Sequence, residues 1–155
     1  MRSVLKFGMA AGLCVPIAAM AADTVQLTPG RWEVTTTFVT VLLDGQPMPN
    51  DLFKSPPGFD CISPAFAAEP ARYFLEPDSA KDCKPGGTVA DGHIAMAGKC
   101  AMPFGEMMAR GVGTYQSKSY EVIMKADATM DGKPLVMNFA LRGKYVGACK
   151  GDEEK

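Results

Sequence analysis

The residues of this chain with the richest chemistry are its five cysteines, which could form disulfides or bind a metal. Cys14 lies in an apolar N-terminal stretch, and the others are Cys61, Cys83, Cys100 and Cys149. Zinc sites usually contain closely spaced cysteine pairs, but these four are far apart in the sequence. Four cysteines in an exported chain instead predict two disulfides, which would leave no thiolate for catalysis.

The N-terminal segment predicts that the chain is exported. Arg2 and Lys6 provide a positive start, an apolar run follows from residue 7 to residue 19, and Ala19-Met20-Ala21 offers the small residues of a cleavage site. The apolar run is shorter than the ~20 residues that a transmembrane helix needs. We therefore expect a signal peptide over residues 1–21, cleavage near Ala21, loss of Cys14 and a periplasmic location.

The remaining composition predicts a single small domain. Without Arg2 and Lys6, the 16 basic residues fall to 14 against 17 acidic ones, so the net charge changes from −1 to −3. No basic patch is apparent in the sequence, which argues against nucleic acid or an anionic membrane surface as a partner. We expect one disulfide-bonded domain over residues 22–149, without a second hydrophobic span, and a flexible tail over residues 150–155.

Residues that could support hydrolysis are few. His93 is the only histidine, and it lies near the tip of a predicted hairpin on its polar face. The carboxylate pairs Asp78 with Asp82 and Glu153 with Glu154 lie in turns or in the tail. A hydrolase needs a nucleophile with a positioned base, and no such pair is recognisable. The sequence therefore favours a non-enzymatic protein without a cofactor, with a hydrolase as the third choice.

Methionine is the unusual feature of the composition. Met102, Met107 and Met108 follow Cys100 closely and predict a Met-rich loop. Thioethers are soft ligands for Cu(I), so periplasmic copper handling is an alternative function. Methionine also fills irregular cores well, and packing is the simpler explanation.

Two Asp-Gly pairs predict β-hairpins with type I′ turns, in which both central residues need positive φ. A turn at Asp131-Gly132 places Val122 opposite Leu141 and continues an apolar face on both strands. A turn at Asp91-Gly92 places Cys83 opposite Cys100, at a distance that suits a disulfide. A strand over about residues 110–116 joins the next strand through residues 117–118.

The N-terminal half predicts one long strand, an irregular loop and a short helix. Alternation runs from Arg31 to Leu43, with one face carrying Trp32, Val34, Thr36, Phe38, Thr40 and Leu42. Four prolines predict an irregular loop over residues 46–60. Ser63 is a good N-cap with Pro64 at the first helical position, and Pro70 should interrupt a helix that extends to Leu75.

The fold class that follows is all-β with minor α. We expect a curved antiparallel meander of about six strands that could close toward a half-barrel, with one short helix. Because the hairpin register pairs Cys83 with Cys100, Cys61 would pair with Cys149 and close most of the domain in one loop.

Several short motifs in a fixed order resemble a known bacterial family. They are Pro29-Gly30-Arg31-Trp32-Glu33, Cys61-Ile62-Ser63-Pro64, the two central cysteines, Tyr115 with Tyr120, and Gly147-Ala148-Cys149. Together these motifs resemble the domain of unknown function 3617. The resemblance spans about residues 27–149. It implies an exported, four-cysteine protein of Gram-negative bacteria without an assigned activity, and it supplies no catalytic residue.

The sequence as a whole favours a non-enzymatic module that binds a partner protein or a small apolar ligand. An apolar sheet face that includes Trp32, Phe38, Phe139 and Tyr145 could line such a site. The simpler expectation is that most of these side chains form the core.

Overall fold

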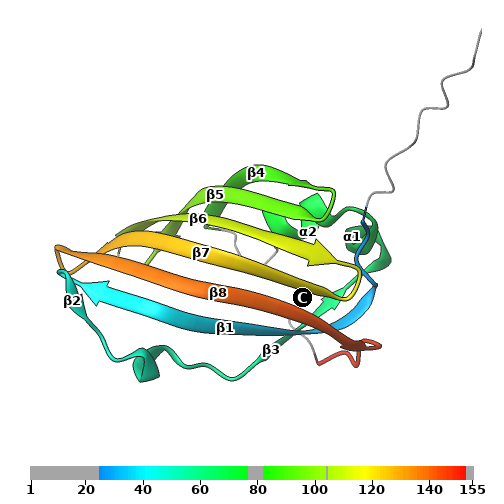
Figure 1. The fold of residues 1–155 in the computed structure, drawn as a ribbon, viewed down its shortest axis with the longest axis horizontal. Helices are drawn as coiled ribbons and strands as arrows, with labels where there is room; N and C mark the ends of the chain where they lie inside the picture. The colour runs from blue at the N-terminus through cyan, green and yellow to red at the C-terminus, as the bar shows by residue number, and fades with distance from the viewer. Residues whose placement is uncertain (1–24, 77–81, 104, 153–155) are drawn as a thin grey trace, which may run out of the picture.

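Eight strands form one antiparallel sheet in the computed structural model, which describes residues 25–76, 82–103 and 105–152. The elements are β1 (Gly30–Leu43), β2 (Gln46–Pro47), the 3₁₀-helix η1 (Asn50–Phe53), β3 (Gly58–Ile62), α1 (Pro64–Ala68), α2 (Pro70–Leu75), β4 (Cys83–Ala90), β5 (His93–Met102), β6 (Gly105–Gln116), β7 (Ser119–Met130) and β8 (Lys133–Gly147). The strand order is β2-β1-β8-β7-β6-β5-β4, and β3 pairs with β1 beside this path. Figure 1 shows a twisted sheet with α1 and α2 near one end.

The Asp-Gly pairs form the tight turns. Asp44-Gly45, Asp91-Gly92 and Asp131-Gly132 all have positive φ at both residues, as type I′ turns require. Both predicted hairpin registers are confirmed, because Val122 lies opposite Leu141 and residue 83 lies opposite residue 100. Local turn chemistry therefore sets most of the sheet.

The segment between β1 and the helices is more ordered than predicted. The expected irregular loop over residues 46–60 contains β2, η1 and the first part of β3. Hence the sheet has eight strands rather than six. β3 was missed because it pairs with the distant start of β1, and no hairpin turn connects the two. Among the described strands the path ends at β2 and β4, so the sheet stays open and does not close toward a half-barrel.

A β-bulge changes the faces of β1. Phe38 pairs with Phe139, but Thr40 already pairs with Asn138, so Val39 is the extra residue. After a bulge the alternation continues in the opposite phase. Val41 is therefore buried, and the prediction that Thr40 and Leu42 continue the face of Trp32 is wrong.

The expected single short helix is two helices: α1 starts at Pro64 as predicted, and α2 starts at Pro70, where an interruption was expected. The Ser63 hydroxyl accepts a hydrogen bond from the Phe66 amide at 3.4 Å, and Pro70 occupies the first turn of α2. We call the sheet face that packs with these helices the inner face and the opposite one the outer face. The buried members of the inner core are Leu27, Trp32, Ile62, Ala67, Phe74, Ile94, Tyr115, Tyr120 and Val122. Across the described residues, we find no helix with the length and apolarity to span a membrane.

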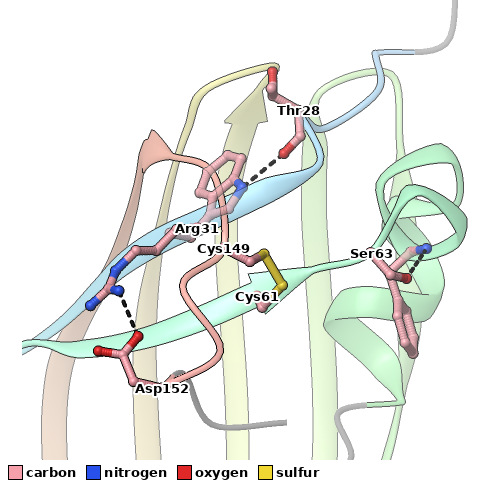
Figure 2. The surroundings of a disulfide bond; sticks show 8 residues. Thr28, Arg31, Cys61, Ser63, Cys149 and Asp152 are labelled. Atoms are coloured by element: carbon pink, nitrogen blue, oxygen red, sulfur yellow. Dashed lines mark hydrogen bonds and ion pairs between the residues drawn. A yellow bond between two sulfur atoms is a disulfide. The ribbon is translucent and has the colours of Figure 1, made fainter.

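Two disulfides connect distant elements. Cys61 and Cys149 have Cα atoms 5.6 Å apart and join β3 to the segment that follows β8, as Figure 2 shows. Cys83 and Cys100 join β4 to β5, with Cα atoms 3.9 Å apart. The hairpin register predicts Cys83–Cys100, and Cys61–Cys149 is the pairing that then remains.

The C-terminal segment is partly docked on the sheet. The Arg31 guanidinium donates a hydrogen bond to the Asp152 carboxylate at 2.7 Å, and Figure 2 shows the two side chains beside the disulfide. Arg31 is 8% exposed and also stacks over the ring of Phe59. Asp152 of the expected flexible tail over residues 150–155 thus contacts β1, residues 153–155 lie outside the described part, and the flexibility of the tail stays a prediction.

Candidate binding groove on the outer face

Two large apolar side chains are exposed on the outer face. Val112 of β6 lies directly opposite Ile123 of β7, and their exposed fractions are 65% and 52%. The solvent face of a half-buried antiparallel sheet normally carries polar residues, so this pair departs from the usual pattern. Exposed apolar patches on monomeric proteins often mark binding surfaces.

The exposed pair forms one side of a groove of about 610 Å³ that crosses β4 to β8. Its lining is Gly86, Gly87, Ala95, Met96, Ala97, Arg110, Gly111, Val112, Ile123, Met124, Lys125 and Asn138. The hollow has a simple cause. On the outer face the cross-strand positions of β4 and β5 hold the small residues Gly86 and Ala97, whereas β6 and β7 hold longer side chains. The volume lies within the range of small-molecule sites.

Charged and polar side chains border the groove at one end. Arg110 lies opposite Lys125, and Asn138 continues the same row on β8. One carboxylate, Asp127, lies 3.5 Å from the Arg110 guanidinium and 3.7 Å from the Lys125 ammonium. The groove thus combines an apolar base with hydrogen-bond donors at one end.

The aromatic residues singled out in the sequence lie on the inner face instead. Trp32 is fully buried, and its indole donates a hydrogen bond to the Thr28 carbonyl at 2.9 Å. Its ring contacts Tyr145 at 6.2 Å between centroids, while Phe38 contacts Phe139 at 5.2 Å. Trp32 and Tyr145 belong to the core, as the simpler expectation held.

Three polar groups meet inside the aromatic core. The Tyr73 hydroxyl donates to Asp60 at 3.0 Å, so the Tyr120 hydroxyl, 3.3 Å away, is left to donate to the Tyr73 oxygen. Burial raises the pKa of Tyr120 to about 12 and also raises the pKa of Tyr73 above its ordinary value. The cluster connects α2 to β3 and β7 in one hydrogen-bonded chain, which is a structural role.

The methionines do not form the predicted loop. β5 extends to Met102 and β6 begins at Gly105, so all three methionines lie in strands. Met107 pairs with Cys100 on the inner side, whereas the next residue, Met108, points to the outer face and is 41% exposed. The three thioethers therefore do not converge on one point. The described residues also contain no metal-binding group of three or more His, Cys, Asp or Glu side chains.

The other predicted chemical residues are dispersed. His93 is exposed on the outer face at the start of β5, opposite Thr114. Asp82 is an exposed turn residue. The expectations for Cys14, Asp78, Glu153 and Glu154, and for the signal peptide, fall outside the described residues.

The groove was not predicted, although the sequence contained a signal for it. The same register that places Tyr115 opposite Tyr120 also places Val112 opposite Ile123. Both residues are in the polar phase of their strands, between Arg110 and Thr114 on one side and Glu121 and Lys125 on the other. Two β-branched residues paired in a polar phase indicate an apolar patch in solvent.

This architecture defines a class: a small disulfide-linked protein with an open antiparallel sheet, which has two short helices near one end of its inner face and a groove on its outer face. Residues 27–149 match the family described as "Protein of unknown function (DUF3617)", and the chain belongs to that family. The match confirms the resemblance drawn from the sequence motifs. No curated protein and no solved structure matches the chain with significance.

Proposed function

We propose that this protein is an exported, non-enzymatic module that binds a small apolar ligand in the outer-face groove. The observation that carries the proposal is the cross-strand pair Val112 and Ile123, which is exposed where a solvent face is normally polar. A ligand that covers this pair would remove apolar surface from water, at roughly 25 cal/mol per Å².

Export to the periplasm is part of the proposal. Its support is the N-terminal sequence, with Arg2, Lys6 and a cleavage site near Ala21, together with the two disulfides. Disulfides persist in oxidising compartments such as the periplasm. We propose that the mature domain begins after residue 21.

The proposal of a non-enzymatic role rests on where the reactive groups lie. The sulfur atoms of Cys61, Cys83, Cys100 and Cys149 are committed to disulfides, and His93 lies away from the groove lining. The groove offers Arg110, Lys125 and Asn138, which bind and orient ligands but do not supply a nucleophile with its base.

A neutral fluorescent probe tests the proposal. N-phenyl-1-naphthylamine should bind the purified protein with a saturable rise in fluorescence. The double variant Val112→Ser/Ile123→Ser should weaken binding about tenfold, because two apolar contacts are lost. The control Val39→Ser/Val146→Ser removes two other exposed apolar side chains, 64% and 44% exposed, and should leave binding unchanged. Equal affinity for both double variants, or no saturable binding to the parent protein, would refute the proposed site.

A further inference from the structure

Like charges face each other across two neighbouring rows of the outer face. Arg110 lies opposite Lys125, and one row away Lys84 lies opposite Lys99. Like charges in directly opposed positions destabilise a sheet, so such pairs are normally avoided. The sequence did not suggest a basic patch, because these four residues come from four different strands and meet only through the registers.

The carboxylates around these cations offset them incompletely. Asp127 lies between Arg110 and Lys125, at 3.5 Å and 3.7 Å, so one carboxylate is shared by two cations. Lys99 pairs with Glu106 at 2.9 Å. Asp82 lines a hollow with Lys84 and Lys99, and within the described part of the chain no carboxylate lies within 4 Å of the Lys84 ammonium.

The other side of the groove shows a different arrangement. There Glu121 lies opposite Arg142, and the two side chains form an ion pair. The sheet thus carries complementary charges on one side of the apolar pair and like positive charges on the other. In a chain with a net charge of −1, this local positive excess is a specific feature that attracts anions to one end of the groove.

From this juxtaposition we infer that the groove binds a single-chain anionic amphiphile, whose carboxylate lies between Arg110 and Lys125 and whose aliphatic chain covers Val112 and Ile123. The inference rests on the proposed function and adds the chemistry of the ligand. Arg110 presents several N–H donors in a plane that suits a carboxylate. Its side chain is 69% exposed, and that of Lys125 is 48% exposed, so a carboxylate in the groove can reach both cations and compete with Asp127 for them.

The test compares three ligands that share one ten-carbon chain: decanoate, decanol and decyltrimethylammonium. Calorimetric titration at low salt should give a decanoate affinity at least tenfold higher than that of decanol and higher still than that of the cation. In Arg110→Gln/Lys125→Gln, the preference for decanoate over decanol should fall to about twofold or less. Lys133→Gln/Lys144→Gln changes the net charge equally, at exposed residues outside the groove, and should keep the preference.

The outcomes separate this inference from the proposed function. Equal binding of decanoate and decanol by the parent protein overturns the anionic preference but leaves an apolar groove. Failure of all three ligands, and of the neutral naphthylamine probe, removes the proposed function itself. Sedimentation with phosphatidylglycerol vesicles without binding of monomeric decanoate would identify a membrane surface as the partner and overturn the inference.

Discussion

Similar apolar residues are buried on one face of the β6–β7 hairpin and exposed on the other. On the inner face, Val122 lies opposite Gly113 and is fully buried in the core, whereas on the outer face Ile123 lies opposite Val112 and both are exposed. A side chain on Gly113 would approach the Val122 Cα to 2.7 Å, so the glycine leaves room for close packing. The comparison teaches that the β-branched residues of this hairpin are buried on the inner face but exposed on the outer face, so packing in the core does not explain the outer pair.

The largest effect should come from the disulfide between Cys61 and Cys149, which closes the longer loop. Cys61 and Cys149 are separated by 88 residues, and Cys83 and Cys100 by 17. In the chain-entropy model, replacing both cysteines by serine should cost about 4.5 kcal/mol for the longer loop and about 3 kcal/mol for the shorter one. Urea denaturation of the two double variants measures these losses. A larger loss for the Cys83–Cys100 pair would contradict this order.

The next effect tests the two faces directly with adjacent residues. Val122→Ala should lower the free energy of unfolding by about 2 kcal/mol, because a cavity forms in a packed core. Ile123→Ala should change it by less than about 0.5 kcal/mol, because the side chain is largely in solvent. Chemical denaturation of both variants provides the comparison. A large loss for Ile123→Ala would mean that the outer pair is structural and would weaken the proposed groove.

The smallest effect is a loss of stability at alkaline pH, which arises from tyrosines on the inner face. All four tyrosines belong to the inner core or pack against it. Burial raises the pKa of Tyr120 from 10.0 to about 12, so the folded state retains a proton that the unfolded chain loses above pH 10. The contribution of Tyr120 to the free energy of unfolding is therefore fully present below pH 10 and falls as the pH rises toward 12. The loss from this residue is about 1 kcal/mol at pH 11.

Tyr120→Phe removes this titration. The loss of unfolding free energy between pH 8 and pH 11 should be smaller in the variant than in the parent protein, as measured by urea denaturation at both pH values. An identical loss in both proteins would show that the Tyr120 hydroxyl titrates as it does in the unfolded chain.

The sequence predicted the elements that local chemistry determines. Asp91-Gly92 and Asp131-Gly132 can form only a few kinds of turn, so the registers of two hairpins followed, and with them the cysteine pairing. Ser63 and Pro70 likewise marked the helices. These signals lie within a few residues of the structure they specify.

Features of the fold that depend on pairing between distant segments or on a β-bulge could not be predicted from the sequence. β3 joins the start of β1 without a hairpin turn, and the bulge at Val39 inverts the faces of β1 although the sequence continues to alternate. The groove was missed for another reason. Alternation identifies the buried face of a strand, but it does not indicate whether the exposed face holds a binding site, and Val112 and Ile123 stand among polar residues in the sequence.

The pairing of β1 with β8 has a consequence for the order of folding. The hairpins β4–β5, β6–β7 and β7–β8 close through turns of two residues and can form within microseconds. β1 must wait for the last strand of the chain, since Phe38 pairs with Phe139 and Glu33 with Lys144. Contacts so distant in sequence slow folding, and the unpaired edges of β1 and β8 are exposed to aggregation in the meantime. Oxidation of Cys61 and Cys149, which brings β3 against the end of β8, would then mark completion of the domain.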